Sequence, residues 1–408
     1  MPNPSPLSYE ARGSSTEVLL VFLRLGCTSF GGPIAHLGYF QKEIVERRRW
    51  CSEAALAELI ALAQSLPGPA SSQVGFALGL LRAGWLGGLA AWLGFTLPSA
   101  LLMFAFAYGH SFLAGVTGAR VVHGLQLVAV AVVAQAILAM RTTLAPDRLR
   151  ITLAIAATAI TLFSPARIAT LIAIAFGAAA GLSLCRSEDD SPNEPTLLPR
   201  PKTAGVIAAT IFLALFVLPP LIAHVVSTPG IAIFSAFYRS GALVFGGGHV
   251  VLPLLEDAVV TPGWVTQQTF LAGYGAAQAL PGPLFSFGAY LGASMFRATG
   301  DPSPRPLLYG LLGLIGIFTP GLLAMAAVLP FWSALRTNIH IRAALKGINA
   351  SVVGVLIAAL FQPLWTTTVH TAVDFTTALV VFALLTIWKV QPWMVVACVA
   401  VSVLTRFL

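Results

Sequence analysis

Two proline–glycine–proline motifs interrupt apolar stretches of the sequence, and each could form part of a binding site for a small anion. They are Pro67-Gly68-Pro69 and Pro281-Gly282-Pro283. A proline lacks a backbone N–H and clashes with the preceding turn, so one helix should end at each motif and another begin after it. The first N–H groups of the new helix are unpaired, and its dipole adds positive potential. Ser71, Ser72 and Ser286 then add hydroxyl donors. The alternative is a structural kink that holds no ligand.

Two glycine-rich segments precede these motifs, and each follows an arginine by two helical turns. The segments are Phe30-Gly31-Gly32-Pro33 and Phe245-Gly246-Gly247-Gly248, and the arginines are Arg24 and Arg239. Glycine pairs permit close approach of another helix or of a bound ion. An arginine within an apolar helix costs at least about 2.5 kcal/mol at mid-membrane, so it is usually functional. We therefore count these glycines and arginines as candidate anion-binding residues, although the arginines could instead extend to the membrane interface.

Glutamine and histidine side chains near the motifs could also take part. Gln64 and Gln278 each lie three residues before a proline–glycine–proline motif, where an amide can donate to the anion or bond to another helix. His249 and His36 follow the two glycine segments and could carry a proton near neutral pH.

Other kinds of chemistry find little support in the sequence. No pair of acidic residues lies in the middle of an apolar stretch, which argues against a proton or sodium relay and against a carboxylate cage for a metal. No phosphate-binding loop or nucleotide motif occurs. We therefore expect no catalytic residues, no metal and no cofactor. A membrane-embedded reductase is disfavoured because the four cysteines form no close pair: Cys27, Cys51, Cys185 and Cys398.

The composition places these motifs in an all-α polytopic membrane protein. Of the 408 residues, 57% are hydrophobic and only 9% are charged, with a mean hydropathy of +0.86. A soluble domain carries about 25% charged residues, so a soluble enzyme is excluded. The apolar stretches are too long for the strands of a membrane barrel. The net charge of +8 comes from basic loops, so we expect a lipid bilayer and no nucleic acid as partner.

The two sets of motifs belong to an internal repeat. The segment 22–32 returns at 237–247, which is an offset of 215 residues. The segment 63–69 returns at 277–283, at an offset of 214. Several identities in the same order indicate a duplication, and a break that occurs in both halves favours a function over a kink.

The repeat defines the predicted domain boundaries. A polar stretch rich in proline and charge separates the halves, and several apolar runs are too short to cross a bilayer, so broken helices are expected. The predicted segments are an N-terminal tail (1–16), a first transmembrane repeat (17–184), a polar linker (185–203), a connecting transmembrane helix (204–230) and a second transmembrane repeat (231–408).

Loop charges predict that the two halves are inverted with respect to the membrane. Lys42 and the arginines at 47–49 follow the first helix of the first half, whereas Glu256 and Asp257 occupy the matching loop of the second. Basic loops favour the cytoplasm, so equivalent loops lie on opposite sides, as in transporters with inverted repeats. Counting every apolar run as a crossing gives parallel halves instead, and we give the charges more weight.

These motifs resemble those of the chromate ion transporter family in its long, two-domain form. The resemblance covers nearly the whole chain and rests on Phe30–Phe40, Ser65–Ala70, Phe245–His249 and Leu280–Pro283. It implies export of chromate from the bacterial cytoplasm across the inner membrane, and resistance to chromate, with sulfate as a structural analogue. The two halves differ at one position of these motifs, where Pro33 in the first half corresponds to Gly248 in the second.

From the residues and the resemblance together we expect a secondary transporter with alternating access to a site formed by both breaks. Moving one charge through 100 mV is worth about 2.3 kcal/mol, so membrane potential alone could drive export of a dianion, and a proton motive force is the other candidate. A carrier for sulfate or another oxyanion, or an anion channel, fits the residues equally well. The sequence leaves open whether the protein forms a homodimer.

Overall fold

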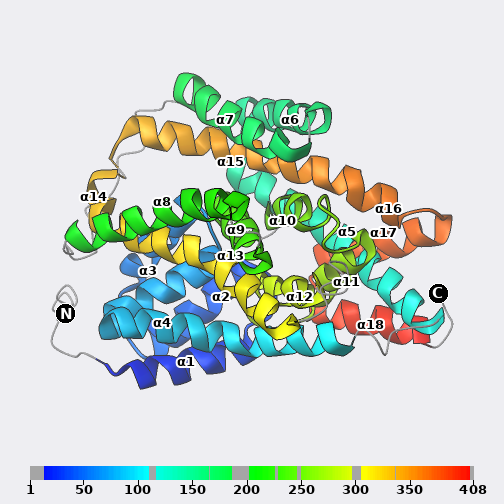
Figure 1. Ribbon diagram of the computed structural model, residues 1–408, viewed down its shortest axis with the longest axis horizontal. Helices are drawn as coiled ribbons and strands as arrows, with labels where there is room; N and C mark the ends of the chain where they lie inside the picture. The colour runs from blue at the N-terminus through cyan, green and yellow to red at the C-terminus, as the bar shows by residue number, and fades with distance from the viewer. Residues whose placement is uncertain are drawn as a thin grey trace.

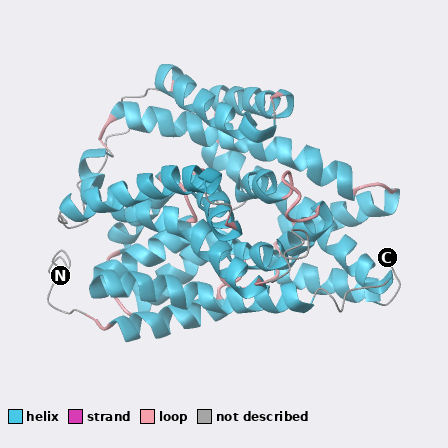
Figure 2. Cartoon of the chain, in the orientation of Figure 1, coloured by secondary structure: helices cyan, strands magenta, loops and turns pink. Residues whose placement is uncertain are grey.

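The computed structural model describes residues 13–109, 116–164, 166–185, 202–225, 228–245, 250–295, 305–335 and 337–404. Within these ranges every regular element is a helix and none is a strand (Figure 2). The expected all-α class is therefore confirmed for this part of the chain.

The helices follow the repeat, with one extra helix between the halves. The first half contains α1 (Ser15–Thr28), α2 (Gly32–Phe40), η1 (Gln41–Arg47), α3 (Glu53–Ser65), α4 (Ala70–Gly109), α5 (Val116–Leu144), α6 (Arg148–Phe163) and α7 (Ala166–Leu184). The connecting helix is α8 (Lys202–Val225). The second half contains α9 (Pro229–Ala242), α10 (Val251–Val259), α11 (Gln267–Gln278), η4 (Leu284–Ser286), α12 (Phe287–Ser294), α13 (Pro306–Val328), η6 (Leu329–Phe331), α14 (Trp332–Leu335), α15 (Ile339–Ala359), η7 (Leu360–Trp365), α16 (Thr366–Thr368), α17 (Ala372–Thr386) and α18 (Pro392–Leu404).

Both proline–glycine–proline motifs interrupt a helix, as predicted. In the first half, α3 ends at Ser65 and α4 begins at Ala70; in the second, α11 ends at Gln278 and the 3-10 turn η4 begins at Leu284. The helices before the breaks start alike, because Ser52 and Thr266 each cap their helix through a side-chain oxygen. The repeat seen in the sequence therefore extends to helix starts and stops.

Five of the described helices are long and apolar enough to cross a membrane: Ala70–Gly109, Arg120–Leu144, Lys202–Ala223, Pro306–Phe331 and Ile339–Thr368. α4 is kinked, because Ala83 and Gly84 have non-helical backbone angles. Its first part, up to the kink, is mostly buried in protein, whereas the second part exposes large apolar side chains such as Leu86 and Leu101. Such exposed apolar surface suits contact with lipid.

Equivalent helices of the two halves run in opposite directions. Trp92 of α4 packs on Phe318 of α13 with ring centroids 5.8 Å apart. Phe104, which comes later in α4, lies against Gly310, which comes earlier in α13, so the two helices are antiparallel. The chain colours in Figure 1 show the same reversal for α5 and α15. The inverted arrangement that the loop charges predict is therefore the one observed, and the count of crossings was the poorer guide.

Some helices of each half pack mainly against helices of the other half. α5 of the first half packs against α17 and α18 of the second, and α15 of the second half packs against α6 and α7 of the first. Small residues allow the backbones to approach closely: Gly347 of α15 lies against the backbone of Gly177 and Gly181 in α7. Thr158 of α6 donates a hydrogen bond to the Gly354 carbonyl at 3.0 Å. Neither half therefore packs independently of the other.

One expectation about the loops was wrong. Glu256 and Asp257 lie on the short helix α10 and not in a loop. α10 is held on α9 by the Ser240 hydroxyl, which donates to the Leu254 carbonyl at 3.2 Å. The run from Val250 to Leu255 is buried, so apolar packing extends the helix up to the two acidic residues.

The close approach of α15 and α7 yields a stability prediction. A Cβ at position 347 would meet backbone atoms of Gly177 and Gly181, which cannot rotate away. We expect Gly347→Ala to destabilise the protein by about 1–3 kcal/mol, measured as a lower Tm in detergent micelles. Gly38→Ala, where a Cβ meets nothing within 4 Å, is the matched control and should change little. Equal Tm values for the two variants would contradict the exchanged packing.

Candidate functional site

Each break is joined to the other half by one backbone hydrogen bond. The Gly68 N–H donates to the Val244 carbonyl at 2.7 Å, and the Gly282 N–H donates to the Ser29 carbonyl at 2.9 Å. Ser29 and Val244 lie just after the first helix of their respective halves and correspond in the repeat. The two bonds are thus equivalent, and they bring both breaks and both first-helix ends to the interface between the halves.

The glycine at the centre of each break is required by this packing. Gly68 and Gly282 have φ values of 121° and 89°, which residues with a side chain rarely adopt. A Cβ on Gly282 would lie 3.1 Å from the Ser99 Oγ of α4, and one on Gly68 would lie 2.6 Å from the Gly321 Cα of α13. Each break therefore fits beside the internal proline of the opposite half, Pro98 or Pro320.

His36 lies at the centre of the polar residues near the first break. Its ring is 1% exposed and meets the Phe95 ring edge-on, with centroids 5.2 Å apart. Its Nδ1 is 3.3 Å from the Ser71 Oγ, and its ring also lies against the Ser29 backbone, but Nε2 makes no well-aligned hydrogen bond to the described residues. When the Ser71 hydroxyl donates to Nδ1, a neutral His36 carries its proton on Nε2 and can donate it to a ligand.

Three hydroxyls accompany His36 in the buried interior. Ser29, Ser72 and Thr96 are at most 2% exposed, and their hydroxyl oxygens make no hydrogen bond to the described part of the chain. A buried polar group without a partner costs about 1–3 kcal/mol, so each of these four atoms is a candidate for contact with a polar guest. The contacts of His36 with Ser71 and Phe95 place its ring beside the chain neighbours of Ser72 and Thr96 in α4. We refer to Ser29, His36, Ser71, Ser72 and Thr96 as the polar cluster.

Gln73 fixes the first break and was missed by sequence reasoning. Its Nε2 donates to the Pro67 carbonyl at 2.8 Å and to the Gly321 carbonyl of α13 at 3.0 Å. Its Oε1 is buried and unpaired among the described residues. The available signal was a fully polar amide one turn into an apolar helix. Ser29 and Thr96 were missed for the same reason, since a single small polar residue in an apolar run is common.

The charge of this region suits an anion. No acidic or permanently basic side chain belongs to the polar cluster, and the N-terminal N–H groups of α4 at positions 70–72 add positive potential. Within the described residues, no group of three or more His, Cys, Asp or Glu side chains could hold a metal ion. Hydroxyl, imidazole and backbone N–H donors can together hydrogen-bond several oxygens of one oxyanion.

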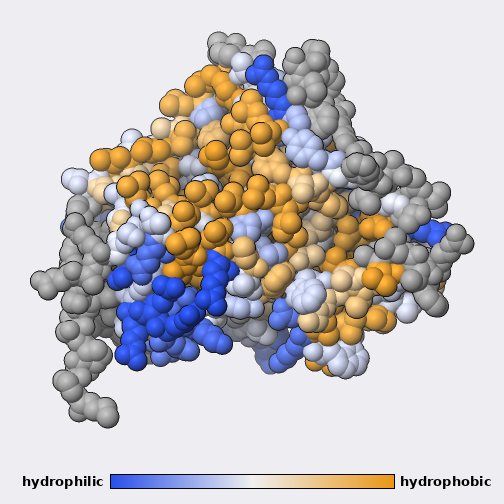
Figure 3. All heavy atoms as spheres, turned by 90° about the horizontal axis from the view of Figure 1, so that it is seen from below, coloured by the Kyte–Doolittle hydropathy of each residue, from blue (hydrophilic) through white to orange (hydrophobic). Residues whose placement is uncertain are grey.

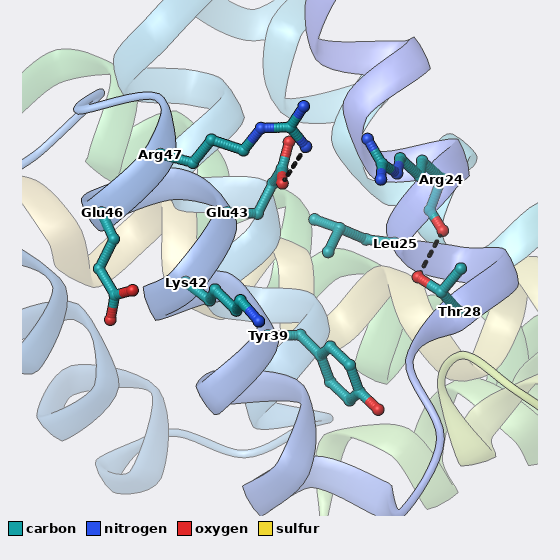
Figure 4. A pocket seen from close by; sticks show the side chains of 8 residues that line it. All are labelled: Arg24, Leu25, Thr28, Tyr39, Lys42, Glu43, Glu46 and Arg47. Carbon is teal, nitrogen blue, oxygen red and sulfur yellow. Dashed lines mark hydrogen bonds and ion pairs between the residues drawn. The ribbon is translucent and has the colours of Figure 1, made fainter.

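The two predicted arginines lie elsewhere. Arg24 is exposed and lines an open pocket of about 410 Å³ formed by α1, α2 and η1 (Figure 4). Arg239 is also exposed, and its guanidinium lies over the Phe216 ring of α8, 5.5 Å from the centroid. The structure therefore does not bring Arg24 and Arg239 to the breaks.

The remaining predicted residues divide into three groups. Ser286 is buried in the 3-10 turn after the second break, and its N–H donates to Pro283. Gly31 and Gly32 have positive φ and start α2, Gln278 is half-buried near Tyr274, and Gln64 is exposed on α3. Gly246, Gly247 and His249 lie outside the described residues.

The pocket is bordered by a network of ion pairs at the start of α1. Glu17 pairs with Arg82 at 3.2 Å, and Glu43 pairs with Arg48 at 2.8 Å and Arg47 at 3.1 Å. Partial burial acts to raise the pKa of Glu43, but the two arginines outweigh it and hold this pKa below its usual value. Figure 3 shows hydrophilic side chains gathered at one end of an otherwise apolar face, the end at which α1 begins.

Comparison with known proteins identifies the family. The family model described as chromate transporter matches residues 16–182 and 231–404, that is, both halves. The chain belongs to the chromate transporter family. It is 29% identical over 388 residues to the chromate transport protein of Pseudomonas aeruginosa, which covers 93% of this chain and 86% of that protein. It is 28% identical to a probable chromate transport protein of Synechococcus elongatus, over 92% of this chain and 90% of that one.

A third family member, the chromate transport protein of Cupriavidus metallidurans, is 26% identical over 88% of this chain and 87% of its own length. No solved structure matches the chain.

The polar cluster yields a binding prediction. Because the Ser72 hydroxyl is buried and unpaired within the described residues, Ser72→Ala should leave the Tm unchanged or raise it. If the hydroxyl binds the oxyanion, loss of a hydrogen bond to a charged group of about 1.5 kcal/mol or more raises the Kd for chromate about tenfold or more. Calorimetric titration of the purified protein measures this.

Ser183→Ala is the matched control for Ser72→Ala. The Ser183 hydroxyl is exposed on α7 and bonds only to carbonyls of its own helix, Ala179 and Ala180. It should bind chromate like the unmodified protein. Unchanged chromate binding by Ser72→Ala would remove Ser72 from the site.

Proposed function

We propose that this protein is a secondary transporter that exports chromate from the bacterial cytoplasm across the inner membrane and thereby confers resistance to chromate. Family membership supports chromate transport. The buried polar cluster between two helix breaks supports an oxyanion site within the membrane. The direction of transport, the driving force and the cellular role go beyond family membership and are what we propose.

The observation that carries the proposal is the set of donors around the first break. Chromate is a tetrahedral dianion with four oxygens, so a site needs several donors and no nearby carboxylate. Ser72 and His36 supply side-chain donors, and Ser71 holds the His36 proton on Nε2 by donating to Nδ1. The start of α4 supplies N–H groups and positive potential. Gly68 and Gly282 would let the backbone approach the ion, and Ser286 would complete the site from the second half.

The pocket on α1 and α2 would be the cytoplasmic mouth of the pathway. Thr28 in its wall precedes Ser29, and Tyr39 follows His36 by one helical turn, so pocket and polar cluster share the same two helices. Arg24, Lys42 and Arg47 give its wall a local excess of positive charge over Glu43 and Glu46. Such a wall raises the local concentration of anions.

Inverted repeats supply a means of alternating access. If the two halves exchange conformations about the interface between the breaks, the site opens first to one side and then to the other. Export of a dianion through 100 mV releases roughly 4.6 kcal/mol, which is twice the value for one charge. Membrane potential can therefore drive the cycle alone, or a proton motive force can contribute.

A carrier for sulfate is the second candidate, because hydroxyl and N–H donors recognise any tetrahedral oxyanion of the same charge. An anion channel is the third. A carrier, but not a channel, shows exchange in which unlabelled anion on one side accelerates exit of labelled anion from the other.

The first test is uptake of labelled chromate into inside-out membrane vesicles with an interior-positive potential. Inside-out vesicles turn export into uptake, so we expect saturable, protein-dependent uptake that falls when sulfate is added. Accumulation of sulfate with chromate acting only as a competitor would indicate a sulfate carrier. Movement of neither anion would contradict the proposed function.

The pocket yields a separate prediction. Arg24→Gln removes positive charge from the proposed mouth, so KM for chromate should rise several-fold, and the rise should shrink at high ionic strength because salt screens the lost charge. Arg239→Gln removes the corresponding exposed arginine of the second half, which lies over Phe216 instead, and should change KM less. Equal KM values for both variants and the unmodified protein would show that the pocket is not the mouth.

A further inference from the structure

The two halves differ in charge at one corresponding turn. The turn after η1 and the turn after α10 match in detail: Trp50 corresponds to Trp264 at an offset of 214, and Arg49 and Gly263 both have positive φ, 54° and 79°. The halves are inverted, so these turns lie on opposite sides of the membrane. The pocket belongs to the first, and Glu256 with Asp257 belongs to the second.

In the first half the carboxylate that corresponds to Asp257 is neutralised. Glu43 is paired with Arg47 and Arg48, as described above. At the same offset of 214 the arginines at 47–49 are replaced by Thr261, Pro262 and Gly263. At this offset Asp257 corresponds to Glu43 and Glu256 takes the place of Lys42, so the second half has acidic groups without the cations that balance them.

The surroundings of Glu256 leave its carboxyl without a cation among the described residues. Glu256 is half-buried and faces the Gln267 side chain at the start of α11. The first half holds a similar acid–amide pair in the opposite order, where the Gln41 amide donates to the Glu53 carboxylate at 3.2 Å. In the first half the acid of this pair, Glu53, is exposed, whereas in the second half the acid, Glu256, is half-buried.

Several charged and titratable groups on the neighbouring helices have contacts other than Glu256, and on α15 His340 and Arg342 lie in its first turn. α10 packs against α9, α15 and α7. On α9, Arg239 lies over Phe216 and the Tyr238 hydroxyl donates to the Phe212 carbonyl. On α15, Lys346 acts on the Cys185 thiol at the end of α7. Asp257, the adjacent residue on α10 itself, adds a second negative charge beside Glu256.

A buried carboxyl with a like charge beside it and no cation favours its protonated form. α10 is not one of the five membrane-crossing helices, and burial, with a smaller contribution from Asp257, raises the pKa of Glu256 to about 8. Burial also raises the pKa of Asp257 to about 6. A group of this kind gains and loses a proton over the pH range of a living cell.

We propose that Glu256 is the proton-binding site through which this transporter couples proton entry to anion export. This inference rests on the proposed function. A proton from the water outside the cell binds a Glu256 carboxylate oxygen, and the same proton leaves to the more alkaline cytoplasm when alternating access opens Glu256 to that side, after the anion has moved outward. No bond other than O–H forms or breaks.

The sign of the pH effect follows from this cycle. Acid outside loads the carboxyl, and alkali inside unloads it, so a pH gradient of this direction should accelerate export even without a membrane potential. Glutamine at position 256 cannot carry a proton, so Glu256→Gln should lose this acceleration and keep transport driven by membrane potential.

The test uses purified protein in liposomes loaded with labelled chromate and clamped at zero potential with potassium and valinomycin. The protein inserts in both orientations, so anion exit is compared with and without an acidic medium. We expect a several-fold acceleration by acid for the unmodified protein and none for Glu256→Gln. Glu53→Gln removes the exposed acid of the corresponding pair and is the matched control, which should be accelerated normally.

Two further measurements cover a variant that fails to fold. Glu256→Asp keeps a titratable group and should retain the acceleration, with its midpoint moved in pH. A pH-sensitive dye inside liposomes of unmodified protein should report acidification when chromate exits at zero potential.

The outcomes separate the two proposals. Normal acceleration of Glu256→Gln, or no proton movement with chromate exit by the unmodified protein, would overturn the role of Glu256 and leave the proposed function intact. If the unmodified protein moves no chromate under a membrane potential either, the proposed function itself fails.

Discussion

The structure depends on how the backbone groups at the two helix breaks are satisfied. Lipid offers no hydrogen bonds, so an interrupted helix inside a membrane must find partners in protein or in a polar cavity. Here the N–H groups of Gly68 and Gly282 bond to carbonyls at Val244 and Ser29, each in the opposite half. Neither half can make its own break without the other.

This mutual requirement explains the rest of the fold. Positive φ at the two central glycines turns the chain where the halves meet, and Ser99 of α4 and Gly321 of α13, each next to a proline in its helix, lie against these turns. The exchange of α5 and α15 between the halves extends the same dependence to the outer helices. A duplicated unit that pairs in this way brings the polar groups of both breaks to the interface between the halves, where movement of one half against the other can change access to a substrate site.

The duplication has not kept the two halves equal. After the first break come Ser71, Ser72 and Gln73, whereas the second break is followed by Leu284 and Phe285 before Ser286. The polar side chains therefore follow the first break, where Ser71 contacts His36. The turns outside the breaks differ in charge as well, with arginines in one half and unbalanced acids in the other. A transporter needs such inequality, because binding and release occur on different sides of the membrane.

Much of the architecture followed from sequence. The composition indicated membrane helices, the prolines indicated where helices break, and the repeated motifs with their loop charges indicated two inverted halves. The helix breaks followed from local chemistry, namely the missing N–H of proline, and the inverted halves followed from the opposite charge of equivalent segments, although Glu256 and Asp257 lie on a helix and not in a loop. These inferences need no knowledge of which residues touch.

The site was only partly predictable for a physical reason. In a membrane protein an apolar side chain can face lipid or the interior, so hydropathy cannot tell which face of a helix is buried. Arg24 and Gln64 are therefore exposed although they lie near the motifs, whereas Ser29 and Thr96 are buried. Sequence alone determined that polar breaks exist in both halves. Only the tertiary structure decided which side chains meet there, because His36, Ser71 and Gly282 come together through packing between helices far apart in the chain.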